Sequence, residues 1–182
     1  MMTMTNTRSN KKPIQNPPNE KTIDQRWQDY QRRIGFYKKT VAKYNAIVKR
    51  IEELYKSTEH LDENNPDDVL KKAEIYGMIL EDVGDLHYIS ITAWKYADAL
   101  KKESYALAII RERPSGRTVE AHREMAVLES QEWRWKMAEW EGLTKRWENA
   151  KTTIEEQIKI MKWKVKWELA NMQQAGMTNP NA

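Results

Sequence analysis

The stretch Arg111–Thr118 reads RERPSGRT and separates two long helical patterns. Pro114 cannot continue a helix, and it disfavours helical dihedrals at the residue before it. Gly116 suits the positive φ of a tight reversal, and Thr118 is a favourable N-cap for the helix that follows. The stretch therefore predicts a helical hairpin with a basic tip at residues 111–118.

The composition agrees with a few long helices in one domain. The chain has 182 residues, with only 6 glycines and 6 prolines to interrupt helices, and no cysteine. Neither a disulfide framework nor thiolate chemistry is therefore expected, and no stretch has the length and hydrophobicity of a membrane span. The net charge of +4 permits an anionic partner without requiring one. We expect an all-α protein in the cytoplasm, meaning the host cytoplasm if a phage encodes the chain.

The expected organisation has four parts. Residues 1–20 are polar and lack hydrophobic periodicity, which predicts a disordered N-terminal arm. Residues 21–60 form an N-terminal heptad helix that begins with a capping-box pattern at Thr22 and Gln25. Residues 61–174 form the long helical hairpin, and residues 175–182 a flexible tail. Apolar residues of the first helix alternate spacings of four and three, as in a coiled-coil seam: Ile23, Trp27, Tyr30, Ile34, Tyr37, Val41, Tyr44, Val48, Ile51 and Tyr55.

The second helix, residues 67–113, carries apolar residues on two faces, which predicts neighbours on both sides. Asn65 is its candidate N-cap, and Pro66 suits its first turn. The third helix is expected from Val119 to about Met172. Its heptad pattern is Trp133, Met137, Trp140, Thr144, Trp147, Lys151, Ile154, Ile158, Met161, Val165, Glu168 and Met172.

A straight third helix would be about 80 Å long, which exceeds the width of one compact domain. Either the helix breaks, near Gly142 or Asn149, or it projects and packs against a partner chain. We favour the partner chain and expect a homo-oligomer. Its seam would consist of Trp140, Trp147, Ile154, Ile158, Met161 and Val165.

The search for catalytic chemistry is mostly negative. The sequence lacks a glycine-rich phosphate loop, a nucleophile elbow and paired zinc-ligand spacing. An acidic cluster at residues 62–68 matches the start of the second helix and lacks the glycine of a calcium loop. We therefore expect a non-enzymatic protein with no catalytic residue, cofactor or metal.

Cationic residues gather toward the predicted tip. They are Lys101, Lys102, Arg111, Arg113, Arg117 and Arg123, with Tyr105 among them. Lysine and arginine neutralise phosphates, and a tyrosine can stack on an unpaired base. The alternative is a solvated helix end, where cations near the C-terminus are favourable. Three arginines in one reversal exceed what capping needs, so both interpretations stay open.

A second basic patch at residues 162–167 reads KWKVKW. Trp163 and Trp167 are one turn apart and lie off the heptad seam, with lysines around them. The patch could be a second packing stripe, a base-stacking surface or a membrane-interface contact. We favour the packing stripe, because other apolar residues follow the same pattern: Ile160, Trp135 and Leu143.

Several motifs carry a family resemblance. They are WKYA at residues 94–97, KKESYALA at 101–108, Arg111 and Arg113 before a glycine-containing turn, and HREMAVL at 122–128 before a long aromatic-containing helix. From about Ala73 to Met172 the chain thus resembles phage recombination mediators of the UvsY type. Those small helical proteins bind single-stranded DNA, assemble into rings and help to load a RecA-like recombinase onto DNA coated by a single-strand-binding protein. The resemblance implies DNA contacts at Lys101, Lys102, Arg111 and Arg113, and oligomer contacts on the helix after the turn. It does not account for the Ile23–Tyr55 helix.

Together these patterns predict an accessory protein that binds single-stranded DNA in phage-type recombination or replication, as a homo-oligomer and without a membrane. A RecA-like recombinase and a single-strand-binding protein are its expected partners. The alternatives are a structural or scaffolding coiled-coil protein, and a small inhibitory protein that docks on a nucleic-acid enzyme. Salt-dependent DNA binding separates the first prediction from a scaffold, which should have none.

Overall fold

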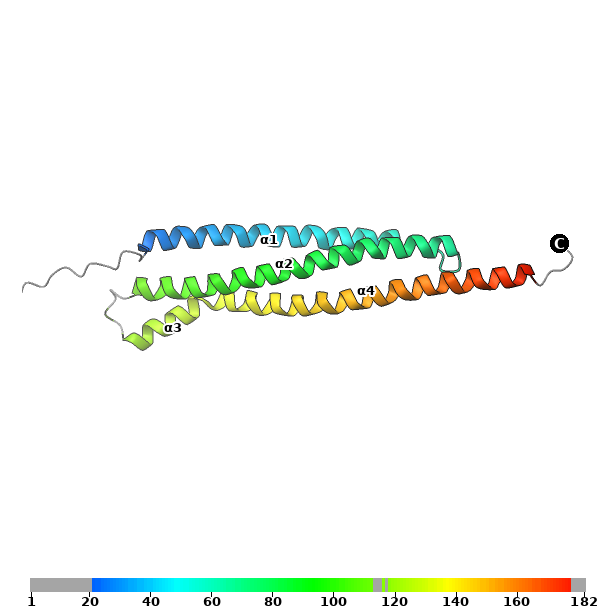
Figure 1. Ribbon diagram of the computed structural model, residues 1–182. Coiled ribbons are helices and arrows are strands. Elements are labelled where there is room, and N and C mark those ends of the chain that lie inside the picture. Colours follow the sequence, from blue (N-terminus) through cyan, green and yellow to red (C-terminus); the bar gives the residue numbers. More distant parts are fainter. Residues whose placement is uncertain (1–20, 113–115, 117, 178–182) are drawn as a thin grey trace, which may run out of the picture.

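Four helices make up nearly all of the described chain. The computed structural model describes residues 21–112, 116 and 118–177. Its helices are α1 (Ile23–Ser57), α2 (Pro66–Glu112), α3 (Val119–Glu129) and α4 (Gln131–Met177). These residues contain no strand, which confirms the all-α prediction. The helices form one elongated bundle, in which α1 and α4 run in the same direction and α2 runs the opposite way (Figure 1).

Side-chain caps explain where α1 and α2 begin. The hydroxyl of Thr22 accepts a hydrogen bond from the Gln25 amide at 3.2 Å, and the Gln25 side chain accepts from the Thr22 amide at 3.0 Å. The Asn65 side chain accepts from the Asp67 amide at 3.0 Å, with Pro66 between them as the first residue of α2. The predicted capping box and the predicted N-cap are both confirmed.

The hairpin turn has the two features that were predicted for it. Gly116 has a φ of 68°, a value that glycine adopts without steric cost. The Thr118 hydroxyl accepts from the Ala121 amide at 3.3 Å and caps α3. Residues 113–115 and 117 of the turn, and residues 1–20 of the predicted arm, lie outside the described residues.

α2 is the central helix, because it packs against each of the other three. The pattern predicted neighbours on both sides of this helix, and these contacts confirm it. Two core clusters lie one after the other along its length. The first cluster lies toward the turn and contains Tyr37, Ala93, Ala97, Leu100, Trp133 and Trp140. The second lies toward the other end and contains Ile51, Ile79, Val83, Leu86 and Ile154.

Three tyrosine–tryptophan pairs join α1 to α4. The indole N–H groups of Trp133, Trp140 and Trp147 donate to the hydroxyls of Tyr30, Tyr37 and Tyr44, at 2.9, 2.8 and 3.1 Å. We call these six residues the Tyr–Trp ladder. Each pair is 103 residues apart, because both runs have heptad spacing. The constant offset fixes the parallel register of α1 on α4.

The ladder is also a chain of ring contacts. The Tyr37 ring meets the Trp133 ring edge-on at 5.3 Å, and the Tyr44 ring meets the Trp140 ring edge-on at 5.0 Å. Such pairs contribute about 0.5–1.5 kcal/mol beyond the area they bury. The same offset continues to Ile51 and Ile154, which are buried in the second cluster. Large aromatic side chains thus fill the first part of the α1–α4 interface, and aliphatic ones the second.

A bidentate ion pair fastens α1 to α2. Nε of Arg50 donates to Asp82 at 2.7 Å, and a second guanidinium nitrogen donates to the other carboxylate oxygen. Asp82 is only 3% exposed. Because a buried carboxylate is costly without a partner, Arg50 stabilises this part of the interface.

The predicted third helix is two helices. It breaks at Ser130, not near Gly142 or Asn149, so the expected single helix from Val119 is wrong. The Ser130 hydroxyl donates to the Val127 carbonyl at 3.0 Å. Back-bonding of this kind competes with helix hydrogen bonds, but it does not break a helix by itself, since Ser104 makes the same bond to Lys101 within the unbroken α2. The bend sets α3 at an angle to α4 and lets it pack beside the end of α2 (Figure 1).

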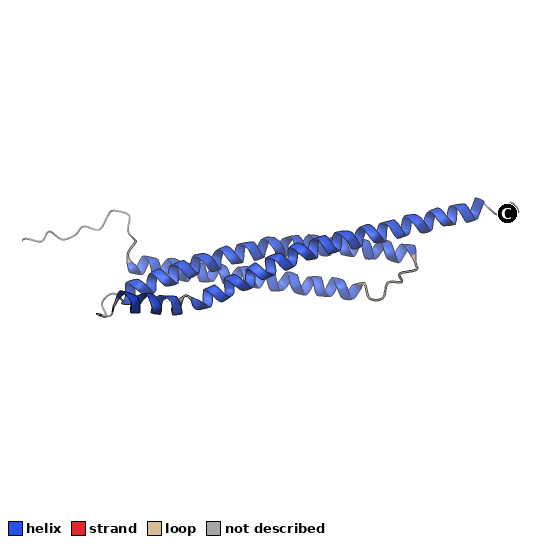
Figure 2. Cartoon of the chain, turned by 90° about the horizontal axis from the view of Figure 1, so that it is seen from below, coloured by secondary structure: helices blue, strands red, loops and turns tan. Residues whose placement is uncertain are grey.

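The C-terminal part of α4 extends past the rest of the bundle. α1 has ended at Ser57 and α2 begins at Pro66, and in two perpendicular views α4 continues beyond the loop that joins them (Figures 1 and 2). We call residues 160–174 the α4 extension, whose first residues still face α2. Met172 continues the heptad seam there and Leu169 lies beside it, and both are exposed because none of the other described helices reaches them.

Candidate nucleic-acid interface

The two lysines before the predicted tip share one carboxylate. Nζ of Lys101 lies 2.9 Å and Nζ of Lys102 lies 2.6 Å from oxygens of Asp98. The hydrogen bonds from Lys102 and Lys101 lower the pKa of Asp98 below its ordinary value. Asp98 is therefore charged at neutral pH, and a DNA phosphate would have to compete with it for both lysines.

The other tip residues divide into three groups. Arg111 forms an ion pair with Glu129 at the end of α3. Tyr105 and Arg123 line one groove between α2 and α3, where Tyr105 is half-buried and Arg123 is exposed. Arg113 and Arg117 lie outside the described residues. The structure thus brings Tyr105 and Arg123 together, and DNA contact by the tip stays a prediction.

The predicted oligomer seam packs within the chain. Trp140, Ile154 and Val165 are buried, and the other three seam residues are half-buried: Trp147, Ile158 and Met161. The pattern of the seam is therefore explained by α1 and α2 of the same chain. Because packing within the chain accounts for this apolar seam, the seam no longer requires an oligomer contact at these residues. Oligomerisation itself stays a prediction.

The second basic patch does not pack within the chain, contrary to the favoured interpretation. Trp163 is 67% and Trp167 56% exposed, and Ile160 is exposed beside them. Trp135, at the other end of α4, is 69% exposed. Of the residues that shared the pattern, only Leu143 packs against the core. The packing-stripe interpretation fails because these positions point away from α1 and α2.

Two of the three lysines of the α4 extension lack acidic neighbours, whereas Lys164 lies beside Glu63. Lys162 and Lys166 are exposed, and neither has an acidic residue three or four positions away. Within the part of the chain that the structure describes, neither lysine forms an ion pair. By contrast, Trp135 has Glu132 and Glu139 at these positions. The extension therefore combines two exposed indole rings with positive charge that no carboxylate neutralises. The sequence showed these residues close together, and their exposure in the structure shows that they do not pack within the chain.

The described residues hold neither a group of three or more His, Cys, Asp and Glu side chains that could bind a metal ion nor a helix long and apolar enough to cross a membrane.

Comparisons of the chain with protein-family models, with curated proteins and with solved structures find no match. The fold places the protein in the class of elongated all-α bundles, and the end of α4 that projects from this bundle carries basic and aromatic residues. The resemblance to mediators of the UvsY type stays a prediction.

Proposed function

We propose that the protein binds single-stranded DNA without catalysis and that the α4 extension is its main contact. The observation that carries the proposal is the pair Trp163 and Trp167, both largely exposed and one turn apart, next to Lys162 and Lys166, which have no carboxylate partner among the described residues. Exposed aromatic rings offer stacking surfaces to unpaired bases, and lysines neutralise the backbone next to them.

The geometry favours the extension over the tip as the first contact. At the tip, Lys101, Lys102 and Arg111 each have a carboxylate partner. On the extension, a DNA phosphate can bind Lys162 or Lys166 without displacing a carboxylate side chain. A role as an accessory protein of phage-type recombination or replication, with a recombinase as partner, belongs to the same proposal and rests on the motif resemblance.

The test is fluorescence anisotropy of a labelled oligonucleotide across a salt series. Wild-type protein should bind a single strand more tightly than a duplex, whose bases are already stacked. Lys162→Ala with Lys166→Ala should weaken binding and make the salt slope shallower by about 1.4, at about 0.7 per phosphate. Lys145→Ala is the matched control, because Lys145 is an exposed lysine of α4 that is already paired with Glu141 at 3.3 Å.

Tryptophan variants test stacking separately. Trp163→Ala and Trp167→Ala should each cost about 1–3 kcal/mol of binding free energy and leave the salt slope unchanged. Trp135→Ala is the control, because Trp135 is equally exposed but has acidic neighbours. The proposal is wrong if the wild type does not bind at low salt, or if the double lysine variant binds as the wild type does.

A protein-docking element is the second candidate function. Leu169 and Met172 are exposed apolar residues at the end of α4, where Met172 continues the coiled-coil seam, and such a surface suits a partner helix. Leu169→Glu with Met172→Glu would then abolish capture of a protein partner while single-strand binding through Trp163 and Trp167 persists. This candidate corresponds to the scaffold and inhibitor alternatives.

A further inference from the structure

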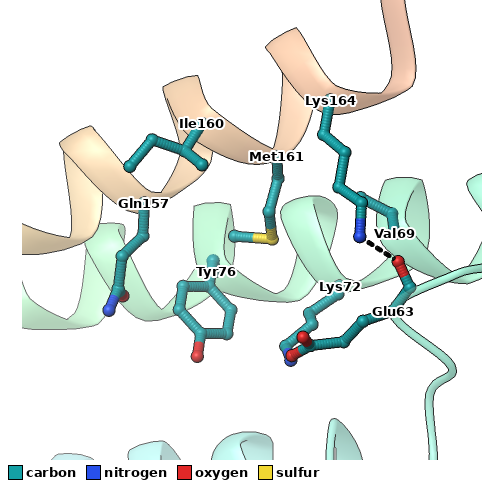
Figure 3. A pocket seen from close by; sticks show the side chains of 8 residues that line it. All are labelled: Glu63, Val69, Lys72, Tyr76, Gln157, Ile160, Met161 and Lys164. Carbon is teal, nitrogen blue, oxygen red and sulfur yellow. Dashed lines mark hydrogen bonds and ion pairs between the residues drawn. The ribbon is translucent and has the colours of Figure 1, made fainter. Parts of the chain in front are cut away.

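A pocket of about 260 Å3 lies where α2, α4 and the loop between α1 and α2 meet (Figure 3). Its positive charges come from Lys72 on α2 and Lys164 on α4, and its negative charge comes from Glu63 in the loop. Figure 3 shows Lys164 reaching down from α4 to Glu63, with Lys72 beside the Glu63 carboxylate. The pocket therefore joins three charged side chains from three separate elements.

Glu63 is bound by both lysines. Nζ of Lys72 lies 2.7 Å from a Glu63 carboxylate oxygen, and Nζ of Lys164 donates to the Glu63 backbone carbonyl. The hydrogen bond and charge of Lys72, and the charge of Lys164, lower the pKa of Glu63. The carboxylate is thus an anion at neutral pH, held in a site with two cations.

The exposure of the partners differs. The Lys72 side chain is 20% exposed, whereas the Glu63 side chain is 72% exposed. The lysine is fixed by the bundle, while the carboxylate occupies the solvent side of the site. An external anion can therefore approach Lys72 from solvent if the Glu63 side chain swings away.

The pocket is continuous with the proposed DNA contact. Ile160 lines the pocket and is also exposed on the extension, and Lys164 lies between Trp163 and Trp167 in sequence. A strand that stacks on these two rings would carry its backbone past Lys164. The site therefore lies within reach of the same ligand.

We propose that Lys72 and Lys164 form a phosphate site, in which the Glu63 carboxylate pairs with Lys72 in the unbound protein and must leave it when a single strand binds. This inference rests on the proposed function. It adds that a side chain of the protein itself, Glu63, competes with DNA for the site. A phosphate oxygen accepts charge-assisted hydrogen bonds from lysine as a carboxylate oxygen does. Because Glu63 is tethered beside the site, it competes at a high local concentration and limits the affinity for DNA.

The test is Glu63→Gln, which keeps the shape of the side chain and removes its charge. The probe is a labelled single-stranded oligothymidylate in an anisotropy titration at several salt concentrations. Binding should tighten by about two- to fivefold, the range that one partly exposed ion pair represents. The salt slope should become steeper by up to about 0.7, since Lys72 loses its carboxylate partner and gains a phosphate, while the bond from Lys164 to the Glu63 backbone carbonyl is unchanged. Lys72→Ala added to Glu63→Gln should return the affinity toward the wild-type value.

Glu59→Gln is the matched control. It removes the same charge from the same loop, and Glu59 is exposed with no side-chain partner among the described residues. It should change the affinity by less than Glu63→Gln and leave the slope unchanged. Circular dichroism of each variant shows whether it is folded.

The outcomes separate the two claims. If the wild type binds and Glu63→Gln is no tighter than Glu59→Gln, the competitor inference is overturned and the proposed function stands. If the wild type does not bind at low salt, the proposed function is wrong, and the competitor inference, which rests on it, is overturned as well.

Discussion

Removal of one hydroxyl from the Tyr–Trp ladder tests how α1 is held on α4. Trp140 donates its indole N–H to Tyr37 at 2.8 Å, and both side chains are at least nine-tenths buried. Tyr37→Phe keeps the ring and its edge-on contacts but leaves the Trp140 N–H without an acceptor. An unsatisfied buried donor costs about 1–3 kcal/mol. We expect the free energy of unfolding to fall by this amount.

The Tyr–Trp ladder also predicts which of its three hydrogen bonds contributes most to stability. Tyr30 and Tyr44 are only half-buried, so water can replace their hydroxyls. Tyr30→Phe and Tyr44→Phe should therefore each cost less, about 0.5–1.5 kcal/mol. Tyr88→Phe is the matched control, because Tyr88 lies on α2 with its side chain 71% exposed, and it should stay within about 0.5 kcal/mol of the wild type.

Urea unfolding followed by circular dichroism measures these differences. A change in the midpoint at constant slope reports a change in stability alone. For a chain of this size, each kcal/mol corresponds to about 2–4 °C in the thermal midpoint. If Tyr37→Phe unfolds at the same urea concentration as Tyr88→Phe, the hydrogen bond does not stabilise the bundle and the reasoning is refuted.

Two further predictions concern charge. Arg50→Ala leaves the buried Asp82 carboxylate unpaired and should cost about 1.5–3 kcal/mol in urea unfolding, whereas Arg32→Ala removes only an exposed pair at 3.7 Å and should cost less than about 1 kcal/mol; equal effects would contradict the role of Asp82. Burial raises the pKa of Tyr37 and Tyr44, so the folded state holds these protons more tightly than the unfolded state does. Their contribution to stability is complete below the tyrosine pKa of the unfolded state, near pH 10, and is lost as the pH rises through the pKa of the folded state. The free energy of unfolding of Tyr37→Phe should therefore fall less between pH 9 and pH 11 than that of the wild type.

Helix content and helix ends could be predicted from the sequence because they depend on local chemistry. Thr22, Asn65 and Thr118 each cap a helix through a bond to a backbone amide two or three residues away. Such contacts need no knowledge of the remaining chain. The bend at Ser130 was missed because serine is also tolerated within helices: Ser104 makes the same kind of bond, to the Lys101 carbonyl, inside the unbroken α2.

The partners of the heptad seams could not be predicted. A four-three pattern shows that a helix has a seam, but the same pattern serves a neighbour in the chain or a second copy. The equal offset of Tyr30 from Trp133 and of Tyr37 from Trp140 follows from the heptad spacing of both runs, so it does not by itself identify which helices pair. The exposure of Trp163 depends on which face of α4 the other helices cover, which is a property of the whole fold.

The central claim is that a single strand lies on the α4 extension. Photochemical cross-linking with a strand that contains 5-iododeoxyuridine, followed by mass spectrometry of the peptides, locates the contact directly. The account predicts adducts at Trp163 or Trp167, which decline as salt is raised because the complex dissociates. Adducts confined to the residues around Tyr105 and Arg111, or none under conditions where the strand is bound, would contradict it.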